Sequence, residues 1–263
     1  MTVLADTVTV WNRDMLRFFR RPSRIVTSLV TPLVWMAMFG YGMKHGFARP
    51  DGTSPLQFGN YASYLDFTAP GIIAMGMLFT SIFSGMSIIF DRQFGFLKEI
   101  LVAPVRRISF VFGKSLGGMS TALIQGVTLL VIATLAFDLR FTTGLGFVAG
   151  FLLCIGVMAM IGVSIVNLGV AIAAKTESHE VFFLISQFLV MPMFFLSGAL
   201  YPTKALPGWF QIVIAVNPMR YGVDALRWAI KGTSELSIYV DVGALLLFTL
   251  VTSVMAARFF ERS

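Results

Sequence analysis

The stretch GLGFVAGFLLCIGVMAMIGVSIVNLGVAIAA, residues 144–174, has no charged side chain and exceeds the about 20 apolar residues that a membrane-spanning helix needs. The rest of the 263-residue chain is similar, since 57% of it is apolar and only 13% is charged. Soluble domains are about one quarter charged, and a soluble fold of this size could not cover so much apolar surface. Runs such as LLLFTLVTSVMAA, residues 245–257, lack the alternation of a barrel strand. The sequence therefore predicts an all-α polytopic membrane protein.

Six transmembrane helices are predicted within one domain, residues 1–263. Their ranges are 25–43, 70–90, 108–137, 144–174, 181–200 and 238–257. We expect these spans to be nearly free of formal charge, with Lys114, near the start of the third, reaching the membrane interface. The single cysteine, Cys154, excludes a disulfide scaffold.

The basic residues are distributed unevenly between the two sides of this arrangement. Of the twenty Lys and Arg residues, thirteen lie on the side that holds the N-terminal segment, the second–third and fourth–fifth loops and the tail. The positive-inside rule assigns that side to the cytoplasm. We therefore expect both termini to be cytoplasmic, with the chain in the cell (inner) membrane. Anionic lipids, rather than nucleic acid, explain the net charge of +7.

An amphipathic helix is predicted over residues 7–21, ahead of the first span. One face is apolar at a spacing of three or four: Val8, Trp11, Met15 and Phe18. Another face is basic at the same spacing: Arg13, Arg17 and Arg20. A basic helix with Trp and Phe opposite is typical of the lipid headgroup plane, and a solvated basic arm is the alternative.

Residues 91–105, DRQFGFLKEILVAPV, are too apolar for a plain cytoplasmic loop. Leu97 and Leu101 need to be covered, and Pro104 ends the predicted helix. An exposed apolar patch on the cytoplasmic face of a membrane protein indicates a partner surface. A helix folded back on its own bundle is the alternative.

Residues 201–237, on the outer side, are predicted to form short re-entrant helices. Prolines divide the segment into apolar pieces that are too short to span a bilayer. Trp and Tyr in these pieces favour a position at the membrane interface.

The sequence shows no recognisable catalytic or metal-binding set. An intramembrane enzyme needs ionisable groups deep within the spans, and a proton-driven transporter needs buried acid or His relays; we recognise almost no such groups there and no such relay. Residues 113–115, Gly-Lys-Ser, match the end of a P-loop, but the first glycine is replaced by Ile108 and no strand precedes it. We therefore expect no cofactor in this chain, and any energy for transport has to come from a partner.

Small polar and aromatic side chains mark a candidate pathway. We assign them as lining: Thr80, Ser84 and Ser87 of span two, with Gln187, Phe194 and Phe195 of span five. The two phenylalanines would narrow the outward exit for a hydrophobic or amphipathic cargo. The alternative for span two is helix packing through small residues and hydrogen bonds, and we favour packing for Thr121, Gln125 and Thr128 of span three.

Two motifs resemble those of type-2 ABC exporter permeases, the ABC-2 family. GFLKEILVAPVRRISFVFGK, residues 95–114, is similar to the family's G-x-L-[EK]-x-[IL]-L-x-[AST]-P-[VI]-x-R run after the second span. LSGALYPTKALPGWFQIVIAVNPMRYGVDALRWAI, residues 196–230, resembles its S-G-x-x-[FY]-P, L-P-x-W and N-P-x-x-[YF]-x-x-D-x-[LR]-R elements. The resemblance covers nearly the whole chain and is strongest to drug, antibiotic-resistance and nodulation-type exporters.

The resemblance implies partners and roles for particular residues. Two permeases, as a homodimer or with a paralogue, pair with two copies of a separate ABC ATPase subunit, which binds ATP and Mg²⁺. The implied coupling helix that docks on the ATPase contains Arg92, Gly95, Leu97, Lys98, Glu99, Leu101, Pro104 and Arg107. The implied interface helix contains Trp11, Arg13, Arg17 and Arg20. The implied extracellular gate contains Ser197, Gly198, Pro202, Pro207, Trp209, Asn217, Pro218, Tyr221 and Arg227.

Two other functions are open at this point. A membrane scaffold or assembly protein would explain the spans but not the segments 91–105 and 201–237. A secondary transporter predicts buried ionisable residues and an internal inverted repeat, and we recognise neither in the sequence.

Overall fold

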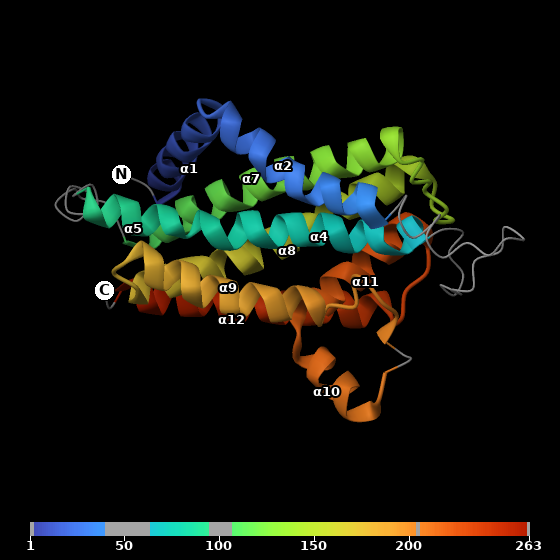
Figure 1. Cartoon of the computed structure of the whole chain (residues 1–263). Coiled ribbons are helices and arrows are strands. Elements are labelled where there is room, and N and C mark those ends of the chain that lie inside the picture. Colours follow the sequence, from blue (N-terminus) through green and yellow to red (C-terminus); the bar gives the residue numbers. More distant parts are fainter. Residues whose placement is uncertain (1–2, 40–63, 95–106, 204–205, 262–263) are drawn as a thin grey trace, which may run out of the picture.

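The computed structural model describes residues 3–39, 64–94, 107–203 and 206–261, which form helices joined by turns (Figure 1). The helices are α1 (Val3–Phe19), α2 (Pro22–Ala37), α4 (Tyr64–Ser84), α5 (Met86–Gln93), α7 (Arg107–Ala136), α8 (Phe147–Lys175), α9 (His179–Phe195), α10 (Gly208–Val216), α11 (Pro218–Lys231) and α12 (Ile238–Glu261). The two ends of the chain lie at the same end of the bundle, and α10 projects from its side (Figure 1).

The apolar helices confirm a multi-pass membrane protein. Four segments are long and apolar enough to cross a bilayer: Tyr64–Gln93, Ser109–Ala136, Phe147–Lys175 and Ile238–Phe260. Two further apolar helices, Ile25–Ala37 and His179–Phe195, are shorter. These six segments correspond in order to the six predicted spans.

Helix boundaries differ from the prediction in several places. The second span begins at Tyr64 rather than Pro70, because the helix accommodates that proline in its second turn. The fifth ends at Phe195 rather than residue 200, since the chain turns there and Gly198 adopts a φ of +71°. The amphipathic helix covers Val3–Phe19 rather than residues 7–21, α2 begins at Pro22 rather than residue 25, and α12 ends at Glu261 rather than residue 257. Residues 40–43 and 95–105 lie outside the described residues.

The core forms where α8 packs against α4, α7, α11 and α12. At the crossing of α8 with the α4–α5 junction, the two backbones touch. A Cβ built on Gly85 would lie 2.5 Å from the carbonyl carbon of Gly169, so only glycine allows this approach. α1 lies across α7 at one end of the bundle.

Candidate functional site

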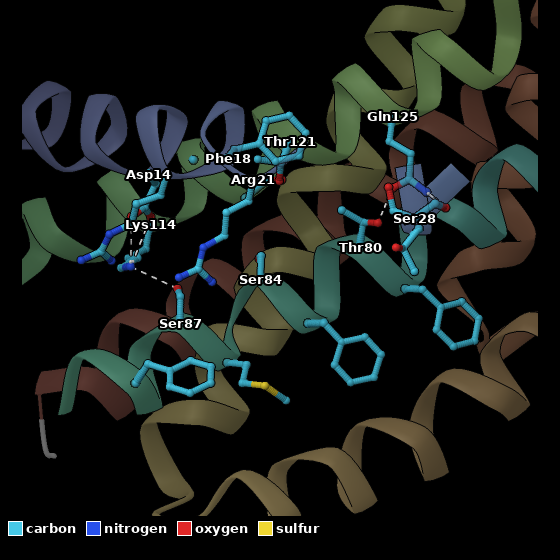
Figure 2. Close-up of a pocket in the computed structure, with 18 of the residues that line it drawn as sticks. Asp14, Phe18, Arg21, Ser28, Thr80, Ser84, Ser87, Lys114, Thr121 and Gln125 are labelled. Carbon is cyan, nitrogen blue, oxygen red and sulfur yellow. Dashed lines mark hydrogen bonds and ion pairs between the residues drawn. The ribbon is translucent and has the colours of Figure 1, made fainter. Parts of the chain in front are cut away.

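A groove of about 1270 Å³ runs along α4 and α5, between α2, α7 and α9, with α1 at one end. Figure 2 shows Asp14, Lys114 and Arg21 at one end of it, and Ser28, Thr80 and Gln125 at the other. The volume exceeds the roughly 300–1,000 Å³ of pockets that take drug-sized ligands. The groove is therefore large enough for an extended molecule.

One wall of the groove is polar. The stripe predicted on the second span lines it, since Thr80, Ser84 and Ser87 all face the cavity. The Thr80 hydroxyl donates to Gln125, whose amide Nε2 donates to the carbonyl of Ser28 at 2.8 Å. These bonds connect α4, α7 and α2, so the same side chains line the groove and join the helices.

The other wall of the groove is apolar. It contains Met75, Phe79, Phe83, Phe90 and, from α9, Phe183. The Phe83 and Phe183 rings stack with their centroids 5.7 Å apart, which closes the gap between α4 and α9. A molecule in the groove thus meets hydroxyls on one side and aromatic rings on the other.

Five charged residues meet at the α1 end of the groove, and we call them the Asp91 cluster: Arg13, Asp14, Arg17, Asp91 and Lys114. Lys114 Nζ lies 2.8 Å from Asp91 Oδ2 and 3.2 Å from Asp14 Oδ2. Arg13 and Arg17 donate to Asp91 at 3.0 and 3.2 Å. The side chains of Lys114 and Asp91 are only 2% and 4% exposed, so this network joins α1, α5 and α7 in a poorly solvated place.

The cluster corrects one expectation. Lys114 does not reach out to the interface but is buried in ion pairs, with Ser87 accepting a further hydrogen bond at 3.0 Å. Arg13 and Arg17 of α1 pair with Asp91 of α5, which offers them a buried counter-charge, and their place at a lipid headgroup plane stays a prediction. The sequence could not show this pairing, since the partners are more than 70 positions apart.

The rest of α1 differs from a simple surface helix as well. Met15 and Phe18 are buried, and Trp11 donates its indole N–H to the Ser120 hydroxyl of α7 at 3.0 Å. Arg20 is exposed. The exposed side of α1 also carries apolar side chains: Leu4, Val8, Leu16 and Phe19.

The predicted coupling segment is described only at its two ends. Arg92 donates to the carbonyls of Ala174 and Thr176, each at 3.3 Å, and so ties the end of α5 to the end of α8. Arg107 is the first residue of α7. The coupling helix therefore stays a prediction. Its other members lie outside the described residues: Gly95, Leu97, Lys98, Glu99, Leu101 and Pro104.

A second polar cluster lies at the opposite end of the bundle, and we call it the Arg227 hub: Asn217, Asp224 and Arg227 of the α11 region. The Arg227 guanidinium donates to the carbonyls of Phe67 and Gly198 at 3.1 and 2.6 Å, and it lies 3.8 Å from the centroid of the Phe67 ring. Asp224 accepts the backbone N–H groups of residues 235 and 236, each at 2.8 Å. Burial raises the pKa of Asp224, and these N–H groups and Arg227 oppose that rise.

Asn217 completes the hub. Its side chain caps α11 by accepting the Met219 N–H at 3.0 Å, and it donates to the carbonyl of Met193 in α9 at 2.7 Å. The hub therefore joins α4, α9, α11 and the chain that leads into α12.

The remaining residues of the predicted outer gate lie between residues 197 and 221. Ser197 donates to the Phe194 carbonyl at 2.6 Å, and Tyr221 donates to the Ala215 carbonyl at 2.7 Å. Pro207 and Pro218 stand at the starts of α10 and α11, Pro202 is partly buried in the connecting turn, and Trp209 is 68% exposed on α10. Their role in a gate stays a prediction.

The structure does not bring the span-five candidates into the groove. Phe194 is buried and packs edge-on against Trp35, while Phe195 is exposed beside it. Gln187 is partly buried on α9 and is not among the lining residues. Narrowing of an outer exit by the two phenylalanines remains a prediction.

Asp241 was missed by the sequence interpretation, which recognised almost no ionisable groups within the spans. It lies in the first turn of α12 and is fully buried, and neither carboxylate oxygen has a hydrogen-bond partner among the described residues. Asp224 and Arg220 of α11 are close enough to interact with it electrostatically. Asp241 is the single acidic residue of the sixth predicted span, and that lone charge was the signal that could have identified it.

The chain is similar to membrane permeases of known families. The family model for "ABC-2 type transporter" matches residues 5–230. The chain is 25% identical to nodulation protein J of Rhizobium meliloti, over 97% of this chain and 92% of that protein. It is 25% identical to a daunorubicin resistance ABC transporter permease protein of Streptomyces coeruleorubidus, over 93% and 81%, and 24% identical to a putative transport permease of Cyanophora paradoxa, over 95% and 86%.

Proposed function

We propose a function from one premise: this chain belongs to the ABC-2 type transporter family. Members are membrane subunits of ABC transporters. On that premise we infer that the chain is the permease of an ATP-driven exporter. It would move a hydrophobic or amphipathic molecule, such as a drug, lipid or glycolipid, out across the cytoplasmic membrane. The groove along α4, within a multi-pass bundle, is the observation that carries this proposal.

Energy would come from two copies of a separate ABC ATPase subunit that binds ATP and Mg²⁺. We propose that segment 91–105 docks on that subunit. Arg92 supports this role, because its bonds to the α8 carbonyls would transmit a displacement of the segment to the centre of the bundle. Two permease copies would complete the transporter.

The coupling role is tested by Leu97→Asp or Leu101→Asp in the complex of the full chain with the ATPase that co-purifies with it. We expect either charge to abolish ATPase stimulation while the chain remains inserted. Leu145→Asp is the matched control, because Leu145 is exposed in the turn before α8 at the other end of the bundle. Normal stimulation in both docking variants would show that another element couples the subunits.

We propose six spans with both termini cytoplasmic. The six apolar segments and the position of both chain ends at one end of the bundle support this orientation (Figure 1). Reporter fusions near Lys98, Thr176 and Ser263 should be cytoplasmic, and those near Thr53 and Gly208 should be extracellular. An extracellular reporter at Lys98 would reverse the orientation.

We propose that the second copy faces the groove, so that α4 and α9 of both copies enclose the pathway. The exposed apolar side chains of α9 support a further wall there. Cysteines placed at Ser84 and Phe183, in a background lacking Cys154, should form cross-links between copies in at least one nucleotide state. Thr31→Trp should block export by bulk, because Thr31 is exposed and lines the groove. Absence of every cross-link would reject this arrangement.

A secondary transporter is the second candidate, and the buried Asp241 is the observation that favours it. Export that stops on ATP depletion but survives a protonophore supports the ABC exporter. Export that stops with the protonophore and with Asp241→Asn supports the secondary transporter. A scaffold protein would give no export under either condition.

A further inference from the structure

We propose that the groove selects an anionic amphiphile, a molecule with a phosphate head group and at least one long apolar tail. The head would lie beside Arg17 and Arg21, and the tail would lie along the aromatic wall of α4, α5 and α9. This inference rests on the proposed function in naming the class of cargo.

The charges at the α1 end of the groove do not balance. Four basic residues, Arg13, Arg17, Arg21 and Lys114, stand against two carboxylates, Asp14 and Asp91. Because Asp91 already accepts from three of the cations, its oxygens are shared. The end of the groove is left with a surplus of positive charge.

The surplus positive charge lies on Arg17 and Arg21. Arg13 and Lys114 are engaged inside the Asp91 cluster, whereas Arg17 is 53% exposed and uses one guanidinium nitrogen for Asp91. The Arg21 guanidinium extends into the groove in Figure 2, and no ion pair or hydrogen bond joins it to the part of the chain that the structure describes. Two arginines therefore present donors to the cavity.

Two arginine side chains suit a phosphate group. A guanidinium is planar, stays charged and donates two parallel hydrogen bonds to phosphate oxygens. The hydroxyls of Ser84 and Ser87 line the same groove as Arg21. Basic pockets between membrane helices commonly hold anionic lipid head groups. A cationic amphiphile would instead be repelled.

The aromatic wall suits an apolar tail. Beside the charged end, the aromatic wall continues from Phe90 through Phe83 to Phe79 and Met75. An acyl chain buried there gains about 0.8 kcal/mol for each CH₂ group removed from water. Head and tail recognition are therefore aligned along one groove, as an amphiphile requires.

The test uses the full chain in phosphatidylcholine vesicles with spin-labelled phosphatidic acid or spin-labelled phosphatidylcholine as the probe. Electron paramagnetic resonance measures the fraction of each lipid that the protein immobilises. We expect a preference for phosphatidic acid of about fivefold for each of the two arginines. Arg21→Gln should remove about fivefold and leave folding intact, because its guanidinium has no partner among the described residues.

Arg258→Gln is the matched control. It removes the same charge from the exposed last turn of α12, away from the groove, and should leave the preference unchanged. Millimolar inorganic phosphate should not displace the labelled lipid, because it lacks a tail. An equal loss in both variants would assign the preference to general surface charge. Displacement by inorganic phosphate would reduce the groove to a simple anion site. Either result overturns the proposal.

The measurement is independent of the proposed function. It needs neither an ATPase nor transport, so a chain that prefers the anionic lipid but exports nothing refutes the exporter alone. A chain that exports without this preference refutes the inference alone.

Discussion

The Asp91 cluster and the Arg227 hub occupy opposite ends of one bundle and stabilise buried charge in different ways. Both hold buried charge among apolar helices. The Asp91 cluster pairs side chains with side chains across α1, α5 and α7. The Arg227 hub pairs side chains with backbone carbonyls and N–H groups. Paired side chains can exchange partners when helices slide, whereas bonds to the backbone fix the path of the chain. We expect the hub end to be rigid and the cluster end to accommodate movement.

The largest effect should come from breaking the hub. Arg227→Ala leaves the buried carbonyls of Phe67 and Gly198 without their donor and removes the contact with the Phe67 ring. We expect a loss of at least about 4 kcal/mol, seen as lost folded yield in the membrane. Arg227→Lys should recover part of this, because one ammonium cannot reproduce the guanidinium fork.

Arg258→Ala is the control for this change, since Arg258 is exposed in the last turn of α12 and lies outside the hub. A folded yield of Arg227→Ala equal to that of Arg258→Ala would show that the hub does not hold the fold.

A smaller effect is expected from the cluster. Asp91→Asn leaves Arg13, Arg17 and Lys114 without their shared counter-charge, which should lower the free energy of unfolding by about 2–4 kcal/mol. The measurement is a double-mutant cycle with Lys114→Met. If the cluster rearranges as we expect, the double variant should be more stable than the sum of the single losses predicts. Strict additivity would mean that the two side chains act independently.

The sequence predicted the fold better than it predicted these two regions. Long uncharged runs identify membrane helices locally, so five of the predicted spans begin within a few residues of their helices. The hub and the cluster depend on pairs such as Phe67 with Arg227, which are 160 positions apart and leave no local periodicity. Thr80 and Ser84 were assigned to the groove because their stripe repeats within one helix. Asp241 was missed because one acid barely changes the hydropathy of a long apolar run.

The smallest effect concerns the link between the cluster end and the core. Arg92→Ala removes two bonds to the end of α8 and should lower the free energy of unfolding by only about 1–2 kcal/mol. Its effect on ATPase stimulation should be larger than this loss of stability suggests, because the segment that follows would lose its fixed attachment. Gln93→Ala, which removes a weaker bond of 3.5 Å to the neighbouring Glu177 carbonyl, is the control. Equal stimulation in the two variants would place coupling elsewhere.

The sequence separation of 160 residues between Phe67 and Arg227 also has a consequence during biosynthesis. Ribosomes add about 5–20 residues per second, so the Phe67 carbonyl waits roughly 8–30 s in the membrane before its donor is made. During this interval the early helices are inserted without the bonds that later fix one end of the bundle. The nascent chain is then most exposed to membrane proteases. The bond between Arg227 and the Phe67 carbonyl forms only after α11 has left the ribosome. Synonymous changes that slow translation between these two residues would prolong that interval without altering any contact in the finished protein.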